Sequence, residues 1–86
     1  MIQLTLYTRP GCHLCDEMKE TVGRVLTHTR TAAHIDEINI ADDPALEALY
    51  GLEIPVLLVN GKKAAKYRIS EMDLARLLRT RAGETE

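Results

Sequence analysis

The first 29 residues constrain the fold most, because they pass directly from a strand pattern to a helix pattern. Apolar and polar side chains alternate over residues 2–7, and this period of two predicts a β-strand. Pro10-Gly11 then interrupts the alternation. Over residues 13–29 the apolar side chains recur on one helical stripe, namely Leu14, Met18, Val22, Val25 and Leu26. The chain is therefore expected to begin as a strand and to continue as a long amphipathic helix.

The middle of the chain predicts a strand and a short helix. Residues 34–40 read as a second strand, and two acidic side chains in its middle favour a position at the sheet edge. Together with the first strand and helix it would form a parallel β-α-β unit. Asp43 is a suitable N-cap, and Pro44 suits the first helical position. We expect this helix to end near Tyr50, with Gly51 as a left-handed cap.

The last third of the chain predicts a hairpin and a final helix. Residues 55–59 are apolar throughout, which is typical of a central strand. Asn60-Gly61 is a strong hairpin signal, so residues 63–67 should return as an antiparallel strand. Ser70 is the expected N-cap of the last helix. The buried stripe of this helix would consist of Leu74, Leu77 and Leu78.

Length and composition limit the class of protein. A chain of 86 residues predicts one domain, over residues 1–81, with a flexible tail at 82–86. The net charge of −2 argues against nucleic acid as a partner, and no apolar run is long enough to span a membrane. With two cysteines and no evident signal peptide, we expect a cytoplasmic protein. No extra apolar stripe stands out, so we also expect a monomer.

The motif that carries chemistry is Cys12-His13-Leu14-Cys15. It falls between the first strand and the first helix, with Cys12 at the helix start and Cys15 one turn further on the same side. Free N–H groups and the helix dipole stabilise a thiolate there, and can lower a cysteine pKa from about 8.5 to roughly 3.5–7.5. We therefore predict that Cys12 is the nucleophile and Cys15 the resolving thiol. Arg9 is close in sequence and would add positive charge.

Other interpretations of the two cysteines are weaker. A structural zinc site needs four ligands, yet His28 and His34 are predicted about 20 Å from the motif, at the far end of the helix. We therefore predict no bound metal. An inert cysteine pair is a further alternative. His13 either tunes the pKa of Cys12 or is an exposed residue without a role.

Two segments resemble the glutaredoxin branch of the thioredoxin superfamily. Residues 7–15, Tyr-Thr-Arg-Pro-Gly-Cys-His-Leu-Cys, are similar to the family's Tyr-x-Lys-Pro-x-Cys-x-x-Cys opening. Residues 54–56, Ile-Pro-Val, are similar to the family's Thr-Val-Pro segment, whose proline is cis. The resemblance implies an α/β protein of the thioredoxin fold, ordered β-α-β-α-β-β-α. It implies a four-stranded mixed sheet with helices on both faces.

The resemblance also implies how substrate is bound. Pro55 would lie opposite the cysteines and would expose the backbone N–H and C=O of Ile54 for pairing with a substrate chain. Glutaredoxins usually carry Gly-Gly-x-Asp after the fourth strand, whereas residues 66–70 here are Lys-Tyr-Arg-Ile-Ser. Arg68 and Arg9 are offered as a carboxylate clamp in its place, since arginine bonds carboxylates bidentately.

These observations predict a dithiol thiol–disulfide oxidoreductase. Its substrate would be a disulfide-containing protein or a low-molecular-weight thiol in mixed disulfide form. No cofactor is expected to be bound, and glutathione is a possible co-substrate. The electron donor would be glutathione or a thioredoxin-type reductase. The alternatives are an iron–sulfur cluster-binding module and a redox sensor without turnover.

Overall fold

The computed structural model describes residues 1–82 and confirms the predicted element order. The elements are β1 (Ile2–Thr8), α1 (His13–Thr29), β2 (Ala33–Asn39), α2 (Pro44–Tyr50), β3 (Val56–Val59), β4 (Lys62–Lys66) and α3 (Glu71–Ala82). A short 3-10 helix, Ile40–Asp42, was not predicted and joins β2 to α2. The predicted bounds of α1 are confirmed, and those of the strands are shifted by about one residue.

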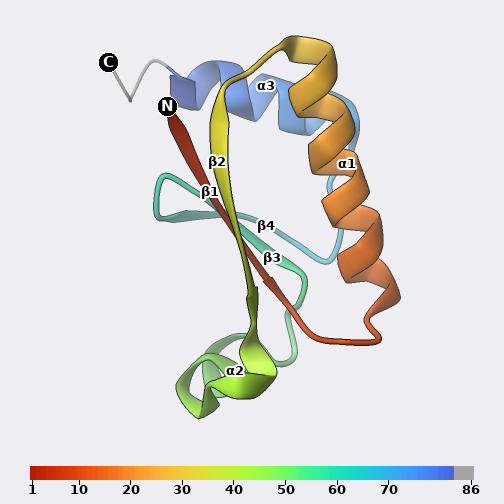
Figure 1. Ribbon diagram of the computed structural model, residues 1–86, viewed down its shortest axis with the longest axis vertical. Coiled ribbons are helices and arrows are strands. Elements are labelled where there is room, and N and C mark those ends of the chain that lie inside the picture. Colours follow the sequence, from red (N-terminus) through yellow and green to blue (C-terminus); the bar gives the residue numbers. More distant parts are fainter. Residues whose placement is uncertain (83–86) are drawn as a thin grey trace.

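The four strands form one mixed sheet in the order β2-β1-β3-β4 (Figure 1). β1 pairs with β2 in parallel and with β3 antiparallel, so that Leu4 lies opposite Ile35 on one side and Val59 on the other. β3 pairs antiparallel with β4. The predicted edge position of β2 and central position of β3 are therefore confirmed.

The core lies between one face of the sheet and helices α1 and α3 (Figure 1). Side chains of β1 alternate between buried and half-buried, as a strand with one covered face requires. The core is aliphatic apart from Met18, because the chain has no Phe or Trp. Its buried members are Ile2, Leu4, Leu6, Met18, Val22, Val25, Leu57, Val59, Leu74 and Leu78.

Helix α2 contacts the opposite face of the sheet only at one end. Tyr7 alternates with the core residues of β1 and so points to that face, where its ring stacks on Tyr50 at a centroid distance of 4.6 Å. No residue of α2 is fully buried. The Asp43 carboxylate accepts the backbone N–H groups of Ala45 and Leu46, as predicted for an N-cap. Much of this face is left without a covering helix.

The hairpin between β3 and β4 has the predicted turn. Asn60 and Gly61 both have positive φ, 51° and 82°, as a two-residue hairpin with a right-handed twist requires. The Asn60 side chain also accepts the backbone N–H of Gln3 at 3.0 Å. The turn therefore fastens the hairpin to β1 as well as reversing the chain.

The predicted left-handed cap at Gly51 is wrong. Gly51 has φ −55° and ψ −31°, which is right-handed helical backbone. A Cβ at this position would lie 2.5 Å from the backbone oxygen of Glu47 and 3.3 Å from the Arg9 guanidinium. Glycine is needed here because neighbouring atoms approach closely, while the backbone angles suit any residue.

The C-terminal boundary differs slightly from the prediction. Ala82 was assigned to a flexible tail, but it is the last residue of α3. The remainder of that predicted tail, 83–86, lies outside the described residues. Within the described chain, no helix combines the length and the apolar character needed to cross a membrane.

Candidate functional site

A tight turn places Cys12 at the start of α1. Pro10 and Gly11 are its central residues, and the Cys12 N–H donates to the Arg9 carbonyl at 3.3 Å. Gly11 has φ 77°, the conformation that a type II turn requires at its third position, and proline suits the second. The Pro-Gly pair that ends β1 therefore also sets the direction in which the motif enters the helix.

Cys12 is the N-cap residue of α1. Its backbone is extended, and its sulfur accepts the backbone N–H of Cys15 at 3.1 Å. The Asp16 N–H donates to the Cys12 carbonyl at 3.2 Å. The sulfur thus lies where the unpaired N–H groups of the first turn and the positive end of the helix dipole favour negative charge.

The two cysteines form a disulfide, with their Cα atoms 5.2 Å apart. Cys12 is half-buried at the surface, whereas Cys15 is 3% exposed and packs beneath it. Because an incoming sulfur can reach only an accessible atom, this asymmetry favours Cys12 over Cys15 as the attacking residue.

The Ile54-Pro55 peptide bond is cis, as the resemblance implied. Val56 follows it and pairs with Tyr7, so this segment and the cysteine motif lie at the same end of the sheet. The Pro55 carbonyl accepts the Tyr67 N–H at 2.9 Å. The expectation that both backbone groups of Ile54 are free is wrong, because its N–H donates to the Tyr50 carbonyl at 3.1 Å.

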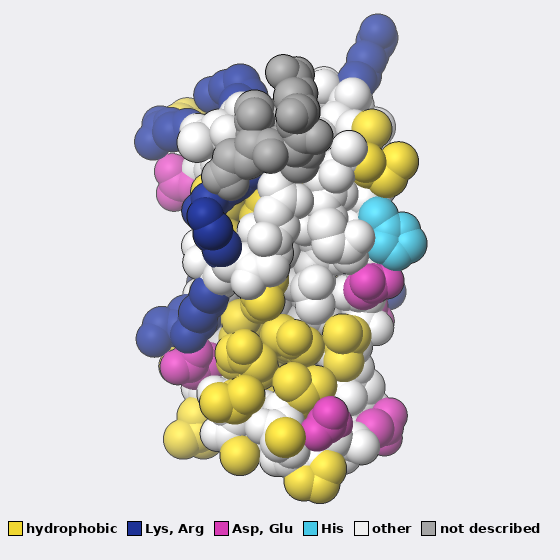
Figure 2. Space-filling view, turned by 90° about the vertical axis from the view of Figure 1, so that its left-hand side faces the viewer, with side chains coloured by type: hydrophobic (Ala, Val, Ile, Leu, Met, Phe, Trp, Pro, Cys, Tyr) yellow, Lys and Arg dark blue, Asp and Glu magenta, His cyan; other side chains and the backbone are white. Residues whose placement is uncertain are grey.

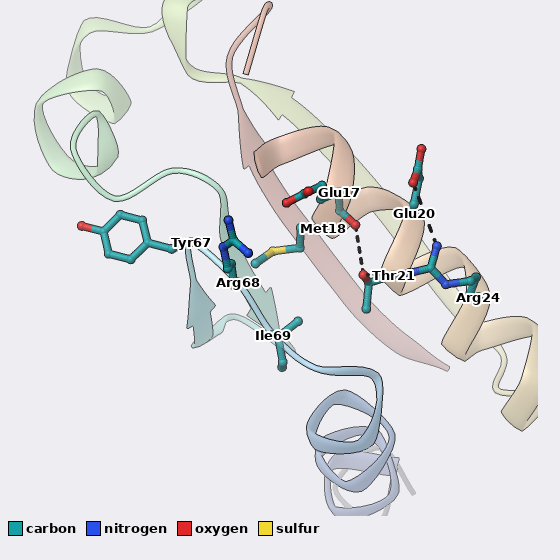
Figure 3. A pocket seen from close by; sticks show the side chains of 8 residues that line it. All are labelled: Glu17, Met18, Glu20, Thr21, Arg24, Tyr67, Arg68 and Ile69. Atoms are coloured by element: carbon teal, nitrogen blue, oxygen red, sulfur yellow. Dashed lines mark hydrogen bonds and ion pairs between the residues drawn. The ribbon is translucent and has the colours of Figure 1, made fainter. Parts of the chain in front are cut away.

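The two arginines proposed as one clamp lie in different places. Arg9 forms an ion pair with Glu47 of α2 and, with Cys15, lines a hollow of about 290 Å³. Arg68 lines a separate hollow of about 350 Å³ together with Glu17 and other residues of α1 (Figure 3). The structure therefore does not bring them together as a pair, and a role for either one alone stays a prediction.

His13 is largely exposed beside the cysteines, with 87% of its side chain accessible. Its Nε2 lies 3.4 Å from the Glu17 carboxylate, one turn along α1. The predicted tuning of Cys12 by His13 is not tested by this geometry and stays a prediction.

Sequence reasoning missed a contact between Tyr67 and the loop before Pro55. Tyr67 has φ 66°, which is uncommon for a residue with a bulky side chain, and its hydroxyl donates to the Leu52 carbonyl at 2.9 Å. The Lys66 ammonium lies 5.5 Å from the centroid of the Tyr67 ring. The available signal was that Tyr67 falls in the segment where glutaredoxins usually carry their glycine pair.

The sheet order, the position of the cysteine pair and the cis proline together define a protein of the thioredoxin superfamily. Residues 3–79 match the model of the Glutaredoxin-like domain (DUF836), so the chain belongs to this family. Fold and cysteine pair together indicate a redox function. No curated protein matches the sequence.

Solved structures agree with this assignment. The chain is 34% identical to the structural genomics target protein XcR50 from X. campestris, with a TM-score of 0.69, over 90% of this chain and 96% of that one. It is 27% identical to protein Ne2328 from Nitrosomonas europaea, with a TM-score of 0.73, over 88% and 89% of the two chains. Chloroplastic thioredoxin z is 9% identical, with a TM-score of 0.75 over 96% and 80%, and shares the fold.

Proposed function

We propose that the protein is a dithiol thiol–disulfide oxidoreductase that acts through Cys12 and Cys15. The observation that carries this proposal is the placement of Cys12 as the N-cap of α1, with its sulfur accepting an N–H and Cys15 buried one turn away. A thiolate at this position keeps the same donor. The neighbouring sulfur is close enough to form the disulfide seen in the structure.

In the reduced protein, the Cys12 thiolate attacks one sulfur of a substrate disulfide. A Cys12–substrate bond forms, the substrate disulfide breaks, and the departing sulfur takes the electron pair as a thiolate. The Cys15 thiolate then attacks the Cys12 sulfur, forms the Cys12–Cys15 disulfide and releases the second substrate thiolate. Two electrons pass to the substrate, and the protein ends in its disulfide form.

Return to the dithiol form needs an external thiol reductant. We propose glutathione or a thioredoxin-type reductase as this donor, and a protein disulfide or a glutathione mixed disulfide as substrate. Pro55 and the Ile54 carbonyl would lie against the substrate sulfur and its chain. Because the Ile54 N–H already has an acceptor, strand pairing would begin at the carbonyl. Arg68 would contact a substrate carboxylate.

The test compares wild type with Cys12→Ser and Cys15→Ser on two substrates. One assay reduces a glutathione mixed disulfide with glutathione and glutathione reductase, and the other reduces a protein disulfide with a small dithiol. We expect Cys12→Ser to abolish both activities, and Cys15→Ser to abolish reduction of the protein disulfide. Wild type that is inactive in both assays, or Cys12→Ser that keeps its activity, would refute the proposal.

A further inference from the structure

We propose that the sheet face opposite α1 and α3 is a contact surface for a second copy of this chain. This face, called the open face below, has half-buried side chains at its centre and charged side chains on its two edge strands. The residues that carry the argument are Thr5, Tyr7, Asp36, Ile38, Leu58 and Lys63.

The strand register arranges residues of the open face in a row across the sheet. Thr5 lies between two buried residues of β1 and therefore points to the open face. It is opposite Asp36 of β2 on one side and Leu58 of β3 on the other. Leu58 in turn is opposite Lys63 of β4. The row therefore runs from an acidic residue at one edge of the sheet to a basic residue at the other edge.

The centre of the open face is apolar and only half-buried. Tyr7, Ile38 and Leu58 come from three neighbouring strands, and α2 lies over one end of this face (Figure 1). Hydrophobic side chains gather over α2 and the adjoining part of the face (Figure 2). A sheet face of this kind is usually buried against another layer. Because its apolar residues are far apart in the sequence, they form no stripe there, and the sequence suggested a monomer.

The charges at the two edges favour a second copy as the covering layer. A two-fold axis along the strands, between two stacked sheets, places β2 of each copy over β4 of the other. Asp36 of one copy then faces Lys63 of the other, and symmetry provides this contact twice. Figure 2 shows Lys and Arg side chains mainly along one border of the face, and a His beside an acidic side chain along the other. The face is therefore complementary to itself.

Both edges keep charge that a second copy can neutralise. The Asp36 carboxylate lies 3.0 Å from the His34 Nε2, and this histidine carries charge only when it is protonated. Lys63 is paired with Glu53. Lys66 points to the same face, because it is opposite Val56, and it forms no ion pair within residues 1–82. The β2 edge of the face therefore stays negative at neutral pH and the β4 edge stays positive.

The size of the open face predicts a weak dimer. Four strands about 4.8 Å apart and a β1 of seven residues at about 3.3 Å per residue give a flat area of roughly 400 Å². Stable interfaces bury about 800 Å² on each partner. We therefore expect a concentration-dependent dimer with a dissociation constant on the order of 0.1 mM.

The experiment measures association of the oxidised protein, in which both cysteines are held in one disulfide and cannot link two copies. Sedimentation equilibrium is run at low ionic strength, because added salt screens exposed charges. The variants are Asp36→Lys and Lys63→Glu, alone and mixed in equal amounts. The matched controls are Lys62→Glu, at the β4 position opposite the core residue Val59, and Glu20→Lys, on α1.

We expect wild type to dimerise and each variant alone to dimerise about tenfold more weakly, because one substitution alters both symmetric contacts. The mixture should form a 1:1 dimer about as tight as that of wild type, since the reversed charge in each variant then faces its complement in the other. Each control should change the dissociation constant less than about twofold.

Three results would overturn the inference. They are a wild type that stays monomeric at concentrations well above the expected dissociation constant, variants that each dimerise as well as wild type, and a mixture that associates no better than either variant alone. Recovery in the mixture supports the inference and also shows that both variants are folded. No disulfide is reduced in this experiment, so its outcome is independent of the proposed function.

Discussion

Replacing Gly51 and Gly23 by alanine should change stability in opposite directions, although the chemical change is the same. Both residues have right-handed helical backbone, so alanine restricts the unfolded chain in each case. At Gly23 a Cβ would meet nothing within 4 Å. At Gly51 it would lie 2.5 Å from the Glu47 carbonyl oxygen, which accepts the Gly51 N–H at 2.8 Å.

The magnitudes follow from these surroundings. Alanine in place of glycine inside a helix gains about 0.8–1.0 kcal/mol, so Gly23→Ala should raise the free energy of unfolding by about that much. Relief of the clash at Gly51 must move the last turn of α2 or the Arg9–Glu47 pair, at a cost typical of overpacking, about 1–3 kcal/mol. After subtraction of an entropic gain of about 0.4–1 kcal/mol, Gly51→Ala should lose up to about 2.5 kcal/mol.

Thermal unfolding followed by circular dichroism measures both effects on the oxidised protein. A change of about 1 kcal/mol shifts the Tm of a domain this size by about 4–8 °C. We expect Gly23→Ala to unfold at a higher temperature than wild type and Gly51→Ala at a lower one. If Gly51→Ala were stabilised as much as Gly23→Ala, the close approach at the end of α2 would be refuted.

Three further predictions concern the cysteines, one carboxylate and one helix cap. Cys15→Ser should retain glutathione on Cys12 after exposure to oxidised glutathione, detectable by mass spectrometry, and an unmodified Cys12 would contradict its role as nucleophile. The hydrogen bond from Lys63, followed by the charges of Lys63 and Lys66, lowers the pKa of Glu53. This ion pair therefore stabilises the folded state at pH values above the usual carboxylate pKa. Its contribution is lost as the pH falls through the lowered pKa of Glu53. Lys63→Met should raise the Glu53 pKa in an NMR titration, and an unchanged value would argue against the pair. Because the Ser70 hydroxyl accepts the N–H of the third residue of α3, Ser70→Ala should cost about 1 kcal/mol in urea unfolding, and no loss would show that the cap contributes nothing.

The sequence predicts those features that depend on neighbouring residues. The alternation of β1, the stripe of α1 and the turn at Asn60-Gly61 each follow from local periodicity or from the φ that a turn demands. The parallel pairing of β1 with β2 and the antiparallel pairing of β3 with β4 follow as well, since a strand and helix in succession favour a parallel unit and a tight turn favours an antiparallel one.

Features that depend on distant residues were not predicted. Arg9 and Glu47 are separated by 38 positions, so their ion pair depends on how α2 is placed against the turn before Cys12. The same placement crowds Gly51, which the sequence suggested was a left-handed cap. The hydrogen bond from the Ile54 N–H to Tyr50 and the left-handed backbone of Tyr67 likewise depend on the contacts around Pro55, where Tyr67 donates its N–H to the Pro55 carbonyl.

Helix α2 contributes no member of the hydrophobic core, so the core does not depend on the side chains of this helix. The segment from Asp43 to Ile54 ends next to the cis proline and contributes no residue to the hydrophobic core. We therefore expect that this segment can be replaced without loss of the fold. Transplanting the corresponding segment of a homologous protein should transfer partner preference without dismantling the scaffold, provided that Tyr7 and Arg9 still find their partners.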